Sequence, residues 1–427
     1  MVTKSAVVFV AASALAACTA PPRSEAPRPA AGDPALSAFI ASIRTVDNHT
    51  HANSTDPGDA DYDALPVDGL GAFELPAMLK PDHPQWIAAK KAVYEGATKP
   101  AGDAFPPWVL DRIGTEVLLA NRIAMGPGLT PPRFRWVSFA DALMYPLSTA
   151  AEAQATPDRV KLFPLEDALL RRYLANLKIA AVPATLDAYL KTVVTPTLEA
   201  QQQGGCVAIK FEAAYLRALD FESVPEPVAA KVYASWAGRG APPHADYKAL
   251  QDFLFRYLAR EAGRLGMAVH IHSFEGVGNY YDIAGADPAL LEPVLNDPAL
   301  HGTNFVVIHA GGSQASHTTG LLWKPNAYAD ISLMTQAYPP AELAAVLKPW
   351  LATFPEKVLF GSDASALGPD MGWEVSAAAG TANGRSALGI ALSDMMAAGE
   401  ITRDRAQEIA TLVLRGNASR LYKLGLR

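Results

Sequence analysis

Short apolar runs alternate with longer amphipathic stretches along most of this chain, and this alternation limits the possible folds more than any other feature. Runs rich in valine, isoleucine and phenylalanine are typical of buried strands. They predict eight strands, at 44–48, 116–120, 135–139, 206–211, 268–272, 304–309, 327–332 and 358–362. The stretches between them predict helices, including 186–203, 247–265, 340–354 and 404–414. Strands that alternate with helices indicate a parallel sheet.

Two parallel architectures fit such an alternation, a closed barrel and an open doubly wound sheet. The open sheet would be expected to carry a glycine-rich dinucleotide loop after an early strand, and this sequence has none. Eight strands with interleaved helices therefore predict a (β/α)8 TIM barrel. Long insertions at 52–107 and 143–185 follow the first and third predicted strands. We expect both to cover the mouth of the barrel, with Trp86, Trp108 and Tyr145 as candidate walls, although core packing is the commoner role for each.

The first residues have the pattern of a targeting segment. One lysine precedes a small apolar stretch at 6–17, which is too short to span a bilayer as a stable helix. The stretch ends in LAAC at 15–18, which resembles a bacterial lipobox and implies lipidation of Cys18. An ordinary secretory signal that contains a cysteine is the alternative. By the same resemblance, Thr19 favours the outer membrane, with the protein facing the periplasm of the bacterial envelope.

The domain prediction follows from that segment. We predict a lipoprotein signal peptide at 1–17, a flexible tether rich in proline and alanine at 18–35, and one barrel domain at 36–427. Only Cys206 remains besides the predicted lipidation site, so no intramolecular disulfide is expected.

Charge and hydropathy limit the classes of molecule that this protein is expected to bind. The net charge is −7 without a basic cluster, which argues against binding to nucleic acid. No internal run is long and apolar enough for a second membrane segment. The expected partners are a small-molecule substrate and, through the lipid anchor, a membrane. Homo-oligomerisation is left open.

Possible metal ligands stand at the ends of several predicted strands. His49 and His51 end the first strand, and residues two apart on a strand share a face. Later strands end near Lys210, His272, His309 and Asp363. Because the C-terminal strand ends of a barrel meet at one mouth, these side chains should converge there. Three histidines and a carboxylate suit a divalent cation such as zinc, with one coordination position left for water.

Longer motifs surround these positions. They are VDNHTH at 46–51, VHIHS at 269–273, VIHAG at 307–311, YADIS at 328–332, FGSDA at 360–364, ANRIAMG at 120–126 and GNASRLY at 416–422. Together they resemble the amidohydrolase superfamily, in the amidohydrolase-related branch of metal-dependent TIM-barrel hydrolases. The resemblance covers essentially the whole mature chain. Lys210 and the AYLR stretch at 214–217 resemble the amidohydrolase domain of nodulin-like, glutamine-synthetase-associated proteins in particular.

The resemblance implies roles for the histidines and the aspartate. The residues that it places at or beside one or two metal ions are His49, His51, His272 and Asp363. His309 would be a second metal ligand or a catalytic acid/base. His270 shares a face with His272, but His272 is closer to the strand end and matches the family pattern. We therefore assign His270 to a deeper layer, as a hydrogen-bonded core histidine.

Lys210 has two possible roles. In binuclear relatives such as phosphotriesterase-like enzymes, a lysine at the end of the fourth strand is carbamylated and bridges two metals. An interior lysine is costly unless it is paired, neutral or modified. The alternative is a lysine that binds a substrate carboxylate or pairs with an acidic neighbour. Cys206 shares its strand face and should simply be buried.

The chemistry expected of such a site is hydrolysis. A bound metal lowers the pKa of its water toward neutrality, and Asp363 is the best candidate for the general base. His309 could stabilise the developing oxyanion. Three arginines are candidates for binding a substrate carboxylate through the planar guanidinium group, namely Arg122, Arg135 and Arg217. For each of them, an ion pair with an acidic residue of the protein is the commoner role.

We expect cleavage of a C–N bond (amide or cyclic amide) or of an ester. Non-oxidative decarboxylation, as in aminocarboxymuconate-semialdehyde decarboxylase relatives, fits the same ligands. A catalytically inactive, lipid-anchored binding protein is the third interpretation.

Overall fold

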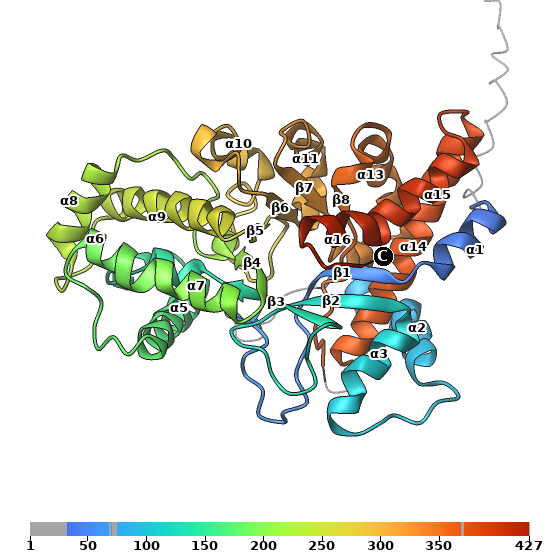
Figure 1. The fold of residues 1–427 in the computed structure, drawn as a ribbon, viewed down its shortest axis with the longest axis horizontal. Helices are drawn as coiled ribbons and strands as arrows, with labels where there is room; N and C mark the ends of the chain where they lie inside the picture. Colours follow the sequence, from blue (N-terminus) through green and yellow to red (C-terminus); the bar gives the residue numbers. More distant parts are fainter. Residues whose placement is uncertain (1–31, 68–69, 71–74, 369–370, 427) are drawn as a thin grey trace, which may run out of the picture. The chain divides into compact units, whose positions relative to one another are not determined.

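Eight parallel strands build the barrel in the computed structural model, which describes residues 32–67, 70, 75–368 and 371–426 (Figure 1). The strands are β1 (Thr45–Thr50), β2 (Thr115–Asn121), β3 (Phe134–Phe139), β4 (Cys206–Phe211), β5 (Ala268–His272), β6 (Phe305–Ile308), β7 (Ala327–Asp330) and β8 (Val358–Leu359). Each pairs with the next in sequence. The chain beyond β8 returns to β1, where Asn48 N donates to Phe360 O at 2.9 Å and His51 N to Ala364 O at 2.7 Å. The predicted (β/α)8 TIM barrel is confirmed.

Helices connect the strands on the outside of the barrel (Figure 1). They are α1 (Pro34–Ser42), α2 (Pro84–Tyr94), α3 (Phe105–Ile113), α4 (Ala150–Ala153), α5 (Pro157–Asn176), α6 (Leu186–Tyr189), α7 (Thr195–Gln203), α8 (Glu226–Trp236), α9 (His244–Arg264), α10 (Glu292–Leu295), α11 (Ala315–Leu321), α12 (Met334–Ala337), α13 (Pro340–Thr353), α14 (Trp373–Ala397), α15 (Arg403–Thr411) and α16 (Asn417–Leu421). Short π-helical segments continue α6 into α7 and α15 into α16.

Two apolar layers hold the barrel together, as expected for strands buried on both faces. Inside, small and branched side chains from successive strands pack together, including Val46, Leu119, Val137, Ala208 and Val306. Outside, the opposite strand faces pack against the helices. The polar residues at the strand ends are therefore attached to a closely packed core.

The two predicted insertions behave differently. The first carries α2, a 3-10 turn (Ala77–Leu79) and the start of α3, and its loop reaches the barrel mouth. The second carries α5, whose apolar side chains join the core between barrel and helices. None of the described residues that line the mouth cavity comes from 143–185. The second insertion therefore does not line the cavity, but it meets the mouth loops, where Arg172 pairs with Asp61 and Asp158 accepts from Tyr280 N at 2.9 Å.

The described chain begins inside the predicted tether. Asp33 accepts a hydrogen bond from Leu36 N at 2.8 Å and caps α1, and it pairs with Arg403 at 2.7 Å. The predicted signal peptide at 1–17 and Cys18 lie outside the described residues, so both stay predictions. Among the helices that the structure describes, none has the length and apolar character needed to cross a membrane.

Candidate metal centre

The two histidines at the end of β1 form the base of the site. β1 is buried along its whole length, and both imidazoles lie on the mouth side with ring centroids 5.2 Å apart. Asn121, which ends β2, places its amide nitrogen 2.8 Å from His49 Nδ1. That contact leaves His49 Nε2 as the nitrogen that faces the cavity.

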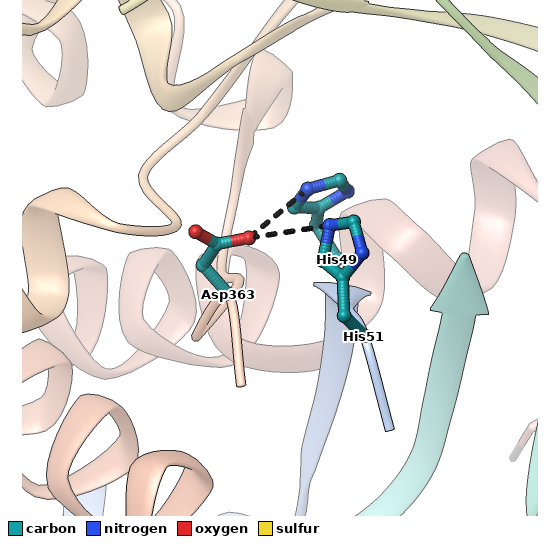
Figure 2. Close-up of side chains that lie close together, drawn as sticks. All are labelled: His49, His51 and Asp363. Atoms are coloured by element: carbon teal, nitrogen blue, oxygen red, sulfur yellow. Dashed lines mark ion pairs between the residues drawn. The ribbon is translucent and has the colours of Figure 1, made fainter. Parts of the chain in front are cut away.

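Asp363 approaches the same point from the other end of the chain. Its Oδ1 lies 3.2 Å from His49 Nε2 and 3.8 Å from His51 Nε2 (Figure 2). The backbone is held in place, because Asp363 N donates to His49 O at 2.9 Å and Ser362 N donates to the buried Asp47 at 2.9 Å. Asp363 also has a positive φ of 59°, which turns its carboxylate toward the imidazoles.

These three side chains fit a divalent cation. Two ligand atoms at zinc distances in a tetrahedral site stand about 3.4 Å apart, and the two measured separations bracket that value. Asp363 Oδ1 is buried and forms no hydrogen bond with a described residue, although two imidazole nitrogens lie nearby. Buried polar atoms are nearly always satisfied. A common cation between them is the simplest partner for this oxygen.

His272 and His309 border the same cavity from β5 and the segment after β6. Their ring centroids are 4.9 Å apart, and His309 lies 5.1 Å from His49. His309 Nδ1 donates to Ser332 O at 3.0 Å, so Nε2 carries the lone pair on the cavity side. His272 bonds to the backbone of Phe274, and its Nε2 is buried without a described partner. Both rings therefore present an unprotonated Nε2.

Burial keeps these imidazoles neutral. It lowers the pKa of His49, His272 and His309 well below the usual range, and the ammonium of Lys210 lowers each pKa further. Neutral imidazole is the form that binds a metal. The surroundings thus keep the three imidazoles neutral, and for His272 and His309 they also leave Nε2 free for a cation.

Lys210 and Glu212 lie beside the centre at the end of β4. Lys210 Nζ is 3.3 Å from His49 Nε2 and 3.8 Å from Glu212 Oε1, and the lysine side chain is 1% exposed. Burial raises the pKa of Glu212 well above its usual range, and the neighbouring Asp63 raises it further. Cys206 is buried, as expected, and burial raises the pKa of its thiol to about 11.

Asp63 comes from the loop after β1. Its Oδ2 lies 3.4 Å from His51 Nδ1, the nitrogen that faces away from Asp363. Asp63, Glu212 and His51 form a second group of closely spaced potential ligands, next to that of His49, His51 and Asp363. We did not predict Asp63 or Glu212 from the sequence. Glu212 follows the same strand end as Lys210, so the rule that found the lysine could have found it.

His270 lies one layer deeper, away from the mouth. Its Nε2 is 2.7 Å from Tyr422 Oη, which also donates to Asn48. Asn48 in turn donates to Asp330 at 2.9 Å. Burial lowers the pKa of His270 to about 3. The histidine is a hydrogen-bonded core residue, as expected.

A cavity of about 580 Å³ opens above these groups. Its described lining includes His51, His272, His309, Lys210, Glu212, Asp63 and Asp363. Tyr215 also lines it, with its ring centroid 4.9 Å from that of His272. The rest of the lining is mainly aliphatic.

The three predicted arginines lie outside the described lining of this cavity. Arg122 is buried and pairs with Asp59 at 2.6 Å, and Arg217 pairs with Asp252 at 2.6 Å. Arg135 stands on β3. The strand-end rule places a Cα atom, but a long side chain can reach away from the mouth to an acid elsewhere.

The three predicted aromatic walls also lie outside the described lining. Trp86 is buried in α2 and donates to Met78 O at 3.1 Å. Tyr145 packs against Phe163, and Trp108 stacks with Phe105. All three serve in packing.

Comparisons with known proteins identify the family and support the fold. A sequence model of the family described as Amidohydrolase matches residues 177–424. A structure from Lactobacillus casei ATCC 334, described as a metal-dependent hydrolase, has a TM-score of 0.64 at 16% identity, covering 92% of this chain and 99% of that one. Uronate isomerase from Thermotoga maritima has a TM-score of 0.59 at 13% identity (91% and 96% covered), and glucuronate isomerase from Caulobacter crescentus 0.58 at 14% (92% and 94%). A search of curated proteins found no match.

Proposed function

Since this chain belongs to the amidohydrolase family, we propose that it is a metal-dependent hydrolase that cleaves an amide, cyclic amide or ester bond. The observation that supports this most directly is the meeting of His49, His51 and Asp363 around an unsatisfied carboxylate oxygen. The donor set of nitrogen and oxygen favours zinc.

The ligands would be His49, His51 and Asp363, with the Nε2 atoms of His272 and His309 facing the same space. A divalent cation there would lower the pKa of a bound water and polarise a carbonyl oxygen. Asp363 is the only carboxylate of that ligand group and also lines the cavity. Its free lone pairs can take a proton from the attacking water and return it to the leaving nitrogen or oxygen.

Hydrolysis then joins the water oxygen to the carbonyl carbon and breaks the C–N or C–O bond. His309 has its proton on Nδ1, so the neutral ring offers a lone pair to the cavity rather than a donor for an oxyanion. We therefore assign it to metal or proton binding. Lys210 has its ammonium in the cavity lining and is the side chain placed to stabilise negative charge on the substrate.

The test is a substrate screen with the zinc- and manganese-loaded protein. N-acyl amino acids, dipeptides, lactones and aromatic carboxylates cover the candidate classes. An Asp363→Asn variant should lose turnover by about 10²–10⁴-fold, while its circular dichroism spectrum stays that of the parent. An equally active variant would refute the assignment of the base.

Product analysis separates hydrolysis from the alternative reaction on the same ligands. Release of carbon dioxide without incorporation of water oxygen would replace the hydrolase by a decarboxylase. Absence of stoichiometric metal in the purified protein at neutral pH would instead favour a binding protein.

A further inference from the structure

The cavity has a charged floor and an aliphatic wall. The floor consists of side chains at the strand ends, around the proposed metal. The wall comes from loops that follow β1, β7 and β8, and we define the aliphatic wall as Leu65, Val67, Leu75, Leu79, Leu333 and Met371. A substrate that reaches the floor must therefore pass along apolar surface.

Part of this surface stays exposed although its residues also pack against the core. Val67, Leu79, Leu333 and Met371 are only partly buried, although each lines the cavity. Concave apolar surface with a few convergent polar groups is the usual composition of a site for a small molecule. The wall is thus available to a ligand group.

The charges in the cavity disfavour an anionic substrate tail. Asp63 and Asp363 are carboxylates of the lining, and Lys210 is the one lysine or arginine among the described lining residues. Its ammonium lies on the floor beside His49 and Glu212, where it would meet the carbonyl group of a substrate rather than its chain. A dicarboxylate or sugar acid would find no second lysine or arginine among the described lining residues.

We propose that the substrate is a carbonyl compound with an uncharged aliphatic chain, which lies against the aliphatic wall while its carbonyl group meets the floor. This inference rests on the proposed function and names the substrate class of the same site. Each methylene that moves from water to this wall should tighten binding about two- to fourfold.

The probes are straight-chain alkylhydroxamates of two to eight carbons, which bind zinc through the hydroxamate and are not hydrolysed. Titration calorimetry on the zinc-loaded protein gives their Kd values. We expect the six-carbon probe to bind at least about 16-fold more tightly than the two-carbon probe. A flat series with zinc-dependent binding would overturn the inference and leave the proposed function intact.

A matched pair of variants locates the effect. Leu79→Gln places an amide of similar size in the wall, and should reduce the ratio of eight-carbon to two-carbon affinity about fivefold. Ile87→Gln makes the same change at a side chain that is 66% exposed and outside the described lining, and should leave the ratio unchanged. Equal ratios in Leu79→Gln and the parent would overturn the role of the wall.

Failure of the proposed function gives a different result. If no hydroxamate bound in a zinc-dependent manner, the metal centre would be refuted. Binding of neutral alkylamides to the aliphatic wall would then be measured on the metal-free protein by saturation-transfer NMR. Chain-length-independent transfer would overturn the inference as well.

Discussion

Asp63→Asn is the sharpest test of how the metal centre is built. Asp63 Oδ2 lies 3.4 Å from His51 Nδ1, and the two side chains are only 16% and 10% exposed. A carboxylate behind a metal-binding imidazole fixes the ring and increases its basicity, and its loss typically weakens metal binding 10- to 100-fold. The asparagine keeps the shape of the side chain but removes its charge.

From the structure, we expect the loss of metal affinity in Asp63→Asn to lie at the low end of this 10- to 100-fold range. The separation exceeds the usual N–H···O distance of about 2.7–3.2 Å, so the carboxylate acts on the imidazole mainly through its charge. We expect the zinc Kd to rise about tenfold, which corresponds to about 1.4 kcal/mol. Competition with a chromophoric chelator measures this directly.

Asp61→Asn is the matched control, two residues away in the same loop. Asp61 pairs with the partly exposed Arg172, and such a pair contributes about 0–1 kcal/mol to stability. Its zinc affinity should equal that of the parent. If Asp63→Asn changed the Kd by less than twofold, or if both variants changed it equally, the argument that Asp63 positions His51 would be refuted.

Three further predictions follow from the buried acid, the metal and the N-terminus. Burial raises the pKa of Asp141 to about 7, so the folded protein holds a proton that the unfolded chain releases near pH 4, and the free energy of unfolding of the metal-free protein should fall as the pH rises from about 4 to 7. Asp141→Asn should lose less stability between pH 5 and pH 8 than the parent in urea unfolding; an equal loss would contradict this pKa. Zinc at 100 times its Kd should stabilise the parent by about 2.7 kcal/mol, and thermal unfolding of His51→Ala should show little of this gain. Cys18→Ser should move the protein from the membrane fraction to the soluble fraction of a bacterial host, whereas an unchanged distribution would contradict the lipid anchor.

The strands were the most predictable part of the fold. β4 and β5 have the predicted bounds, because continuous apolar runs are typical of buried parallel strands. β8 is only Val358–Leu359, since the chain beyond it leaves the ladder to turn toward β1. The 25-residue helix α14 was missed because its alanines, glycines and serines show no apolar stripe. Gly384 there approaches the Phe360 ring so closely that a Cβ atom would clash at 2.8 Å, a constraint that no local pattern reveals.

The site was predictable where backbone position decides the outcome. The short side chain of His49 lies where β1 places it, and Asp363, four residues beyond β8, is held beside it by the bond from its own backbone N to His49 O. Asp63 belongs to an irregular loop, and its meeting with His51 depends on the path of that loop. The positions of arginine side chains were less predictable, because several rotatable bonds allow Arg122 to reach Asp59 instead of the cavity.

The centre straddles the seam where the barrel closes. The bond between Ser362 and Asp47 joins residues 315 positions apart, and the imidazoles stand on one side of that junction with the aspartate on the other. A half-finished chain that lacks its last strand therefore has no complete set of ligands. Metal binding would therefore stabilise the closed barrel. During refolding, the onset of metal binding would report when the first and last strands join.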